Sequence, residues 1–139
     1  MSGGAPSPRS ACPIAIALDV LGDRWSLLIV RDLMFGGPSG FRELAEADEG
    51  IASNILADRL ARLHRAGIVA RRRDRGDRRR VRYGLTAKGM DLAPVLCEIV
   101  LWSARHHRTG APASTLRRMR SHRLEYLDEL RARWSATDR

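Results

Sequence analysis

A stripe of polar side chains recurs at helical spacing near the middle of the chain. Asn54, Asp58, Arg62 and Arg65 follow one another at steps of four, four and three residues, which places them along one face of a helix. An asparagine amide can pair with an adenine edge, and an arginine guanidinium can do the same with guanine. With Ser53 at the helix entrance, this face carries groups that can read base edges in a DNA major groove.

Arginines concentrate directly downstream of this stripe. Residues 71–88 carry nine cations and two anions, whereas residues 1–70 have a net charge of −1 and residues 89–139 of +3. A surplus of charge that served only solubility would be spread along the chain. The local block therefore implies a surface that meets phosphates or an acidic protein, with Arg75, Arg78, Arg79 and Arg80 as its candidate contacts.

The composition is that of one small domain without signs of catalysis. The 139 residues are 44% hydrophobic and 29% charged, ordinary values for a globular chain that is neither disordered nor embedded in a membrane. No Ser/His/Asp set, glycine-rich phosphate loop or paired carboxylates occur in a suitable context, and the four histidines lack metal-ligand spacing. We expect a protein that is not an enzyme, holds no cofactor or metal, and has no membrane partner.

Apolar periodicity predicts three short helices in the first third of the chain, over residues 13–21, 23–34 and 41–48. Pro13 suits the first turn of the first helix, and Gly22 can end it. Asp23 can cap the second helix. These helices must pack on the apolar side of the polar stripe.

A fourth helix over about 52–66 carries the stripe, and two strands over 68–73 and 81–85 follow it, joined by a loop at 74–80. Helices followed by a hairpin form the element order of a winged helix-turn-helix. In that fold one helix enters the major groove, and the hairpin tip lies on the backbone or in the minor groove. The predicted fold class is mainly α with a small β-hairpin wing (α+β).

The last third of the chain predicts two helices, over 87–107 with a bend at Pro94 and over 115–135. The first is apolar around much of its circumference and needs partners on both sides. We expect the N- and C-terminal helices to build a homodimer interface. The predicted organisation is a flexible tail at 1–10, a winged-helix DNA-binding domain at 11–107 and a C-terminal dimerisation helix at 108–139.

Several short motifs carry a resemblance that covers about residues 12–106. They are Cys12-Pro13-Ile14, Leu21-Gly22-Asp23-Arg24-Trp25-Ser26-Leu27-Leu28-Ile29, Phe41-Arg42-Glu43-Leu44, Asp58-Arg59-Leu60, Ala66-Gly67-Ile68-Val69 and Tyr83-Gly84-Leu85-Thr86-Ala87-Lys88-Gly89. With these motifs the chain resembles the HxlR family. The resemblance implies a cytoplasmic, dimeric, bacterial winged-helix transcription regulator, related more distantly to MarR regulators.

The resemblance also implies roles for individual residues. It places the recognition helix at 53–66, with Ser53, Asn54, Arg59 and Arg62 as candidate contacts, and Arg78 to Arg80 in the wing. Two positions depart from the family pattern. Ala52-Ser53 stands where the family has Ser-Pro, and Gly40 stands where a basic residue commonly precedes the phenylalanine.

The two cysteines are too few for a disulfide framework and fit a reducing compartment. Cys12 matches the cysteine through which several HxlR-type proteins sense electrophiles or oxidants, and a helix start favours a thiolate. The alternative role for Cys12 is a small residue packed against a dimer partner. Cys97, in the middle of an apolar helix, is expected to be inert core.

Together these features predict a homodimeric, sequence-specific regulator that binds double-stranded DNA at a pseudo-palindromic operator. A small electrophile or oxidant acting on Cys12 is a further expected partner. Two alternatives remain open at this level. The basic hairpin could dock an acidic protein, or the chain could bind nucleic acid without sequence preference.

Overall fold

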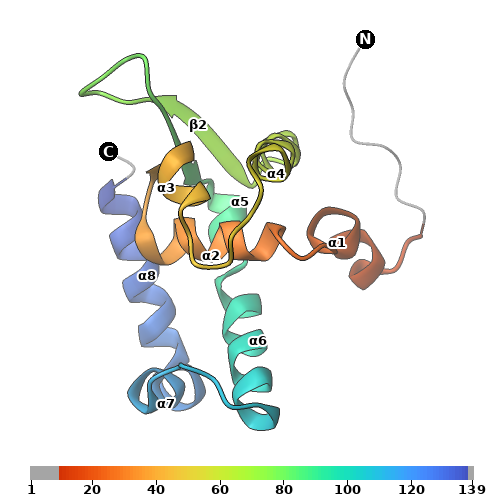
Figure 1. Cartoon of the computed structure of the whole chain (residues 1–139). Helices are drawn as coiled ribbons and strands as arrows, with labels where there is room; N and C mark the ends of the chain where they lie inside the picture. Colours follow the sequence, from red (N-terminus) through yellow and green to blue (C-terminus); the bar gives the residue numbers. More distant parts are fainter. Residues whose placement is uncertain (1–9, 138–139) are drawn as a thin grey trace. The chain divides into compact units, whose positions relative to one another are not determined.

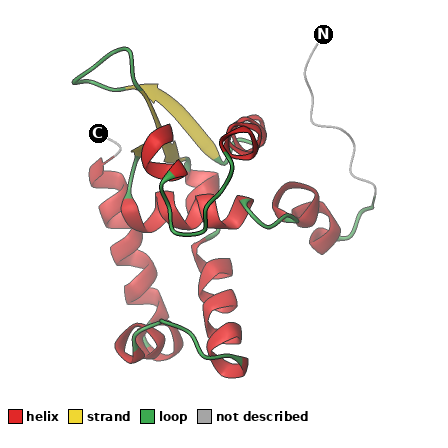
Figure 2. Ribbon diagram, in the orientation of Figure 1, coloured by secondary structure: helices red, strands yellow, loops and turns green. Residues whose placement is uncertain are grey.

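The computed structural model describes residues 10–137, so the flexible tail expected over residues 1–10 lies outside them except for Ser10. The described elements, in chain order, are α1 (Pro13–Leu21), α2 (Ser26–Gly36), β1 (Ser39–Gly40), α3 (Phe41–Ala45), α4 (Ser53–Arg65), β2 (Val69–Arg73), β3 (Val81–Leu85), α5 (Ala87–Met90), α6 (Ala93–His106), α7 (Ala113–Ser121) and α8 (Arg123–Thr137). This order confirms the mainly α fold class with a β-hairpin wing (Figure 2).

The chain divides after Gly89 into two compact units. In the N-terminal unit, α2 and α4 supply most of the buried apolar side chains. Their buried members are Ile29, Val30, Leu33 and Met34 on α2, and Leu56, Leu60 and Leu63 on α4. These residues recur three or four positions apart on each helix, so each helix buries one stripe. The other face of α4 carries exposed residues, whereas the other residues of α2 are half-buried as far as Asp32.

The sheet of the N-terminal unit has three strands in the order β1-β3-β2, all antiparallel. Val69 pairs with Leu85 at the buried base of the hairpin, and the loop from Asp74 to Arg80 projects beyond the strands (Figure 1). The sequence predicted the two long strands but missed β1. Two residues, Ser39 and Gly40, carry no apolar alternation that could reveal a strand.

The base of the hairpin is tied to the end of α4 by the Leu-Thr-x-x-Gly motif. The Thr86 hydroxyl lies 2.5 Å from the Gly67 carbonyl oxygen, and the Lys88 ammonium donates to the Ala66 carbonyl at 2.7 Å. A Cβ on Gly89 would lie 2.4 Å from a backbone carbonyl, so only glycine fits there. The motif therefore positions the wing, and the only lysine of the chain serves a helix C-terminus.

Some predicted helix boundaries were wrong. The expected helix over 87–107 is interrupted between α5 and α6, and Pro94 lies in the first turn of α6, where its missing N–H costs no hydrogen bond. A bend inside one continuous helix is thus replaced by a new helix start. The second helix begins at Ser26 instead of residue 23, and the third ends at Ala45 instead of residue 48.

The expected helix over 115–135 is likewise two helices, α7 and α8, separated at His122. The break lets side chains of both helices meet α6 in the C-terminal unit. There Met119 joins Cys97 and Leu101 in a buried cluster, against which Tyr126 and Leu127 pack. Local sequence around His122 contains neither glycine nor proline, so packing decides where the helix stops.

Candidate nucleic-acid interface

The polar stripe predicted from the sequence lies on α4. Ser53, Asn54, Asp58 and Arg65 are exposed, while Arg62 is partly buried. Ala52 occupies the N-cap position without a side-chain cap, so Ser53 is the first helical residue and its hydroxyl is available to a ligand. The exposed side of α4 thus presents hydroxyl, amide, carboxylate and guanidinium groups in one row.

Arg59 differs from the other arginines of α4 because carboxylates face it on two sides. Its Nε lies 3.2 Å from Asp23 Oδ1, and its Nη1 donates to Asp58. Arg62 and Arg65 make no side-chain ion pair or hydrogen bond among residues 10–137. Of the three arginines proposed from the sequence, Arg59 is the one that has acidic partners among the described residues.

Asp23 organises the start of α2. Its Oδ1 accepts hydrogen bonds from the backbone N–H of Trp25 at 2.7 Å and of Ser26 at 2.9 Å, and its Oδ2 accepts from the Ser26 hydroxyl at 2.5 Å. Burial alone would raise the pKa of Asp23, but these hydrogen bonds and Arg59 together lower it. The N-cap of α2 is Trp25, so Asp23 binds the first N–H groups of the helix from two residues before the N-cap, and it remains a carboxylate that can hold Arg59.

The wing loop is shaped by its two aspartates. Asp74 Oδ1 accepts from the Gly76 N–H at 2.9 Å, and Asp77 Oδ1 accepts from the Arg79 N–H at 3.0 Å. These bonds are the side-chain turns that aspartate commonly makes. They direct the carboxylates to the backbone of the loop rather than to its arginine side chains.

The arginine side chains at the wing tip point to solvent. Arg75, Arg78, Arg79 and Arg80 are exposed, and their guanidinium groups have no ion pair or hydrogen bond within the described chain. Nearer the base, Arg72 lies directly across the sheet from Arg82, and Asp74 Oδ2 lies 3.9 Å from Arg82 Nη1.

A cavity of about 400 Å³ lies between the wing and the start of α3. Arg42, Arg80 and Arg82 contribute cations to its wall, and Glu43 and Asp74 contribute anions. The Arg82 guanidinium already has a partner within the protein, because its Nη2 donates to the Pro38 carbonyl at 2.5 Å. This mixed wall is less suited to a polyanion than the tip of the wing.

The two cysteines lie in contrasting surroundings. Cys12 is exposed at the N-cap of α1, and its backbone N–H donates to the Ser10 hydroxyl at 3.0 Å. Cys97 is buried on α6, and burial raises the pKa of its thiol. The structure places Cys12 where a reagent in solution can reach it and Cys97 where it packs as core.

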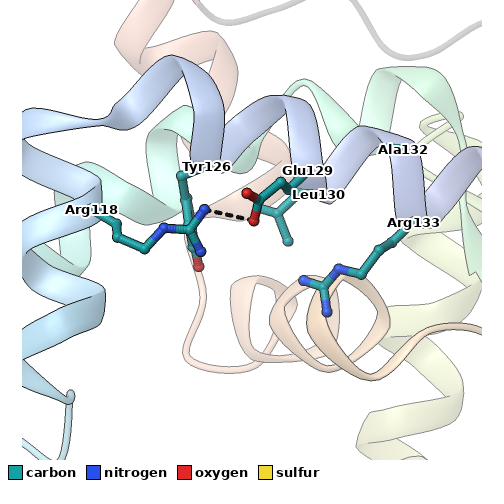
Figure 3. Close-up of a pocket in the computed structure, with 6 residues that line it drawn as sticks. All are labelled: Arg118, Tyr126, Glu129, Leu130, Ala132 and Arg133. Atoms are coloured by element: carbon teal, nitrogen blue, oxygen red, sulfur yellow. Dashed lines mark hydrogen bonds and ion pairs between the residues drawn. The ribbon is translucent and has the colours of Figure 1, made fainter.

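The C-terminal unit has a concave region of its own, with a volume of about 430 Å³ (Figure 3). Arg118 of α7 bonds Glu129 of α8 at 2.6 Å beside it and lies over the Tyr126 ring. Because this ion pair neutralises one of its two arginines, the region carries little net charge. No group of three or more metal-ligating side chains occurs between Ser10 and Thr137, and no described helix has the length and hydropathy of a bilayer span.

Sequence reasoning did not connect Asp23 and Ser26 with α4. The only local signal is the Asp-x-x-Ser spacing, which is typical of a helix start. Nothing in that spacing points to Arg59, because the two segments meet only when α2 and α4 pack.

Comparison with known proteins identifies the family of the chain. Residues 20–110 match the family model described as HxlR-like helix-turn-helix. This range contains α2 to α6 and therefore both the polar stripe and the wing. Helices α7 and α8 lie beyond it.

Two Bacillus subtilis proteins are similar in sequence. The HTH-type transcriptional regulator YvaP, itself uncharacterized, is 38% identical over 87 residues, which cover 63% of this chain and 80% of YvaP. The HTH-type transcriptional regulator YodB is 38% identical over 103 residues, covering 73% of this chain and 91% of YodB.

Solved structures show the same likeness. The reduced form of YodB superposes with a TM-score of 0.59 at 33% identity, covering 73% of this chain and all of YodB. The oxidized form of the redox regulator HypR superposes with a TM-score of 0.60 at 28% identity, covering 70% of this chain and all of HypR.

Proposed function

Because the chain belongs to the HxlR-like helix-turn-helix family, we propose that it binds double-stranded DNA sequence-specifically, as a homodimeric transcription regulator. Its relatives YvaP and YodB are HTH-type transcriptional regulators, which are not enzymes. In this proposal residues 11–107 form the DNA-binding domain, and residues 108–139 contribute to dimerisation.

One observation carries the proposal: an exposed polar helix face is followed directly by a hairpin whose tip arginines lack internal partners. On α4, Ser53, Asn54, Arg62 and Arg65 supply donors and acceptors for base edges and nearby phosphates. At the wing, guanidinium groups can neutralise phosphates or enter a narrow minor groove. The residues assigned to the wing are Arg75, Arg78, Arg79 and Arg80.

Exposed apolar surface supports the homodimer. Helix α1 buries none of its residues, and Ile14 and Leu18, one turn apart, are 71% and 58% exposed. On α6, Val95, Ile99 and Trp102 are exposed at helical spacing. Apolar patches of this kind mark sites of association. A two-fold dimer would read a pseudo-palindromic operator with half-sites about one helical turn apart.

A response to oxidants or electrophiles through Cys12 is part of the proposal. Cys12 is exposed at the start of α1, next to the apolar residues assigned to the dimer interface. YodB, the relative, has been solved in reduced, quinone-bound and diamide-treated forms. Modification of the Cys12 thiol by a quinone or by diamide would then shift the dimer between DNA-competent and DNA-incompetent arrangements.

The test is a binding titration of the purified protein with DNA from upstream of its own gene and with random DNA, across a salt series, with and without diamide. Footprinted binding that prefers the upstream DNA would support the regulator. Equal, salt-labile binding to all DNA would favour a non-specific binder, and no binding would favour an acidic protein partner. Specific binding that ignores diamide would separate DNA recognition from thiol sensing.

A further inference from the structure

One polar network lies inside the N-terminal unit, between the start of α2 and the middle of α4. It consists of Asp23, Ser26 and Arg59. Ser26 is 1% exposed and is the buried polar residue of the described chain, and the Arg59 side chain is 22% exposed. Leu56 and Leu60, on either side of Arg59 along α4, are buried.

The network has partners for nearly every polar atom. The Asp23 carboxylate receives three hydrogen bonds from the first turn of α2 and faces Arg59 Nε at 3.2 Å. That Nε is fully buried and has no hydrogen bond of good geometry, so charge holds it against Asp23. The other end of the guanidinium bonds Asp58.

An arginine engaged in this way is poorly placed to bind DNA. To reach a phosphate or a guanine edge, Arg59 would have to give up its ion pair with Asp23, a carboxylate that is only 18% exposed, and the loss of a partly buried charged partner is costly. The two carboxylates also neutralise its charge locally. Arg59 therefore differs from Arg62 and Arg65, whose side chains have no acidic partner in the described chain.

The network gives α4 a preferred orientation on α2, which the apolar contacts of α4 alone do not. Hydrophobic contact is non-directional, so leucine packing alone leaves a helix able to slide or rotate by a small amount on its neighbour. A charged pair with directional hydrogen bonds has one favourable geometry. The network therefore selects one orientation of α4 on α2.

We propose that Asp23, Ser26 and Arg59 form a clamp that orients α4 on α2, and that Arg59 is a positioning residue for the DNA-reading face rather than a DNA contact. This inference rests on the proposed function for its DNA readout. It reassigns a residue that the family resemblance had placed among the contacts, and it adds Asp23 and Ser26, which are not among the DNA contacts proposed above.

The test is a double-mutant cycle with Asp23→Asn, Arg59→Gln and the double variant, measured as affinity for operator DNA over a salt series. Arg65→Gln is the matched control on the same helix. We expect each single clamp variant to bind about tenfold more weakly, and the double variant to bind no more weakly than either single variant, because coupled neighbours are not additive. The salt slope should stay unchanged for the clamp variants and fall by nearly one unit for Arg65→Gln.

A second measurement tests the clamp independently of DNA binding. The same double-mutant cycle, measured as the free energy of unfolding in urea without DNA, should also be non-additive. If Asp23→Asn does not fold, Ser26→Ala takes its place in the cycle. No DNA binding by the wild type would overturn the proposed function while leaving this readout intact. Additive unfolding effects, or a salt slope that falls by nearly one unit in Arg59→Gln, would overturn the clamp.

Discussion

Helix α4 and the tip of the wing are both rich in arginine, yet the arginines have different surroundings. In the middle of α4, Arg59 lies between Asp23 and Asp58. At the tip, Arg78 and Arg79 have no acidic partner among residues 10–137. The comparison shows that nearby carboxylates, rather than the number of cations, decide whether an arginine is engaged within the protein or remains available to a ligand.

The wing is instructive because it contains carboxylates of its own. Asp74 and Asp77 lie among its arginines, but their carboxylates accept hydrogen bonds from the backbone N–H groups of Gly76 and Arg79. They shape the turn without neutralising the tip. The same residue type at Asp23 binds the first N–H groups of a helix and also holds a cation, because α4 packs against that helix start.

The largest effect should come from the wing. Replacing Arg78, Arg79 and Arg80 with alanine removes cations that have no internal partner, so we expect affinity for all DNA to fall on the order of a hundredfold at low salt. The salt slope should flatten by nearly one unit per lost phosphate contact. The charge-matched control replaces Arg108, Arg117 and Arg120, exposed residues outside the proposed DNA-binding domain, in a variant that keeps the oligomeric state of the wild type. An equal loss of DNA affinity in that variant would show that net charge alone matters.

A smaller and more selective effect is expected on α4. Arg62 lies on the polar stripe without an acidic partner in the described chain, so Arg62→Ala should weaken operator binding about tenfold while changing binding to random DNA little. Competition between operator and random DNA measures this difference. Unchanged discrimination would remove Arg62 from base readout.

The pairing of Asp23 with Arg59 should make the free energy of unfolding depend on pH in the acid range. Asp23 has its pKa lowered in the folded protein from an ordinary value of 3.8, so its contribution to stability is present above that value and is lost as pH falls through the folded pKa. Asp23→Asn should cost about 1–2 kcal/mol at neutral pH. Urea unfolding should show this gap closing below about pH 4. A gap independent of pH would mean that the charge of Asp23 does not contribute.

The smallest structural effect should come from replacing Cys12. The comparison here is between the two thiols, Cys12 and Cys97. Cys12 is exposed and Cys97 is buried with a raised pKa, so one thiol should react with a maleimide in the native protein and two after denaturation. Cys12→Ser should fold and bind operator like wild type but no longer respond to diamide. Release of this variant by diamide would exclude Cys12 as the sensor.

Much of the fold could be predicted from the sequence because its signals are local. Apolar residues at helical spacing marked α1, α2 and α4, and the arginine-rich loop between two β-prone runs marked the wing. The same approach missed β1 and placed one helix where α7 and α8 stand. A two-residue strand forms only because β3 pairs with it, and the α7–α8 break follows packing on α6, so neither has a signature in its own residues.

By itself, the sequence determined which side chains form the polar stripe and where the cations concentrate, since helical period and local charge are properties of adjacent residues. Only the tertiary structure decided which of those cations remain available. The sequence placed Arg62 on the polar stripe and, through the family resemblance, offered Arg59 as a second contact. Their difference in availability arises when the start of α2 brings Asp23 Oδ1 to 3.2 Å from Arg59 Nε. Electrostatic pairing acts over a few ångströms in space, whatever the separation along the chain.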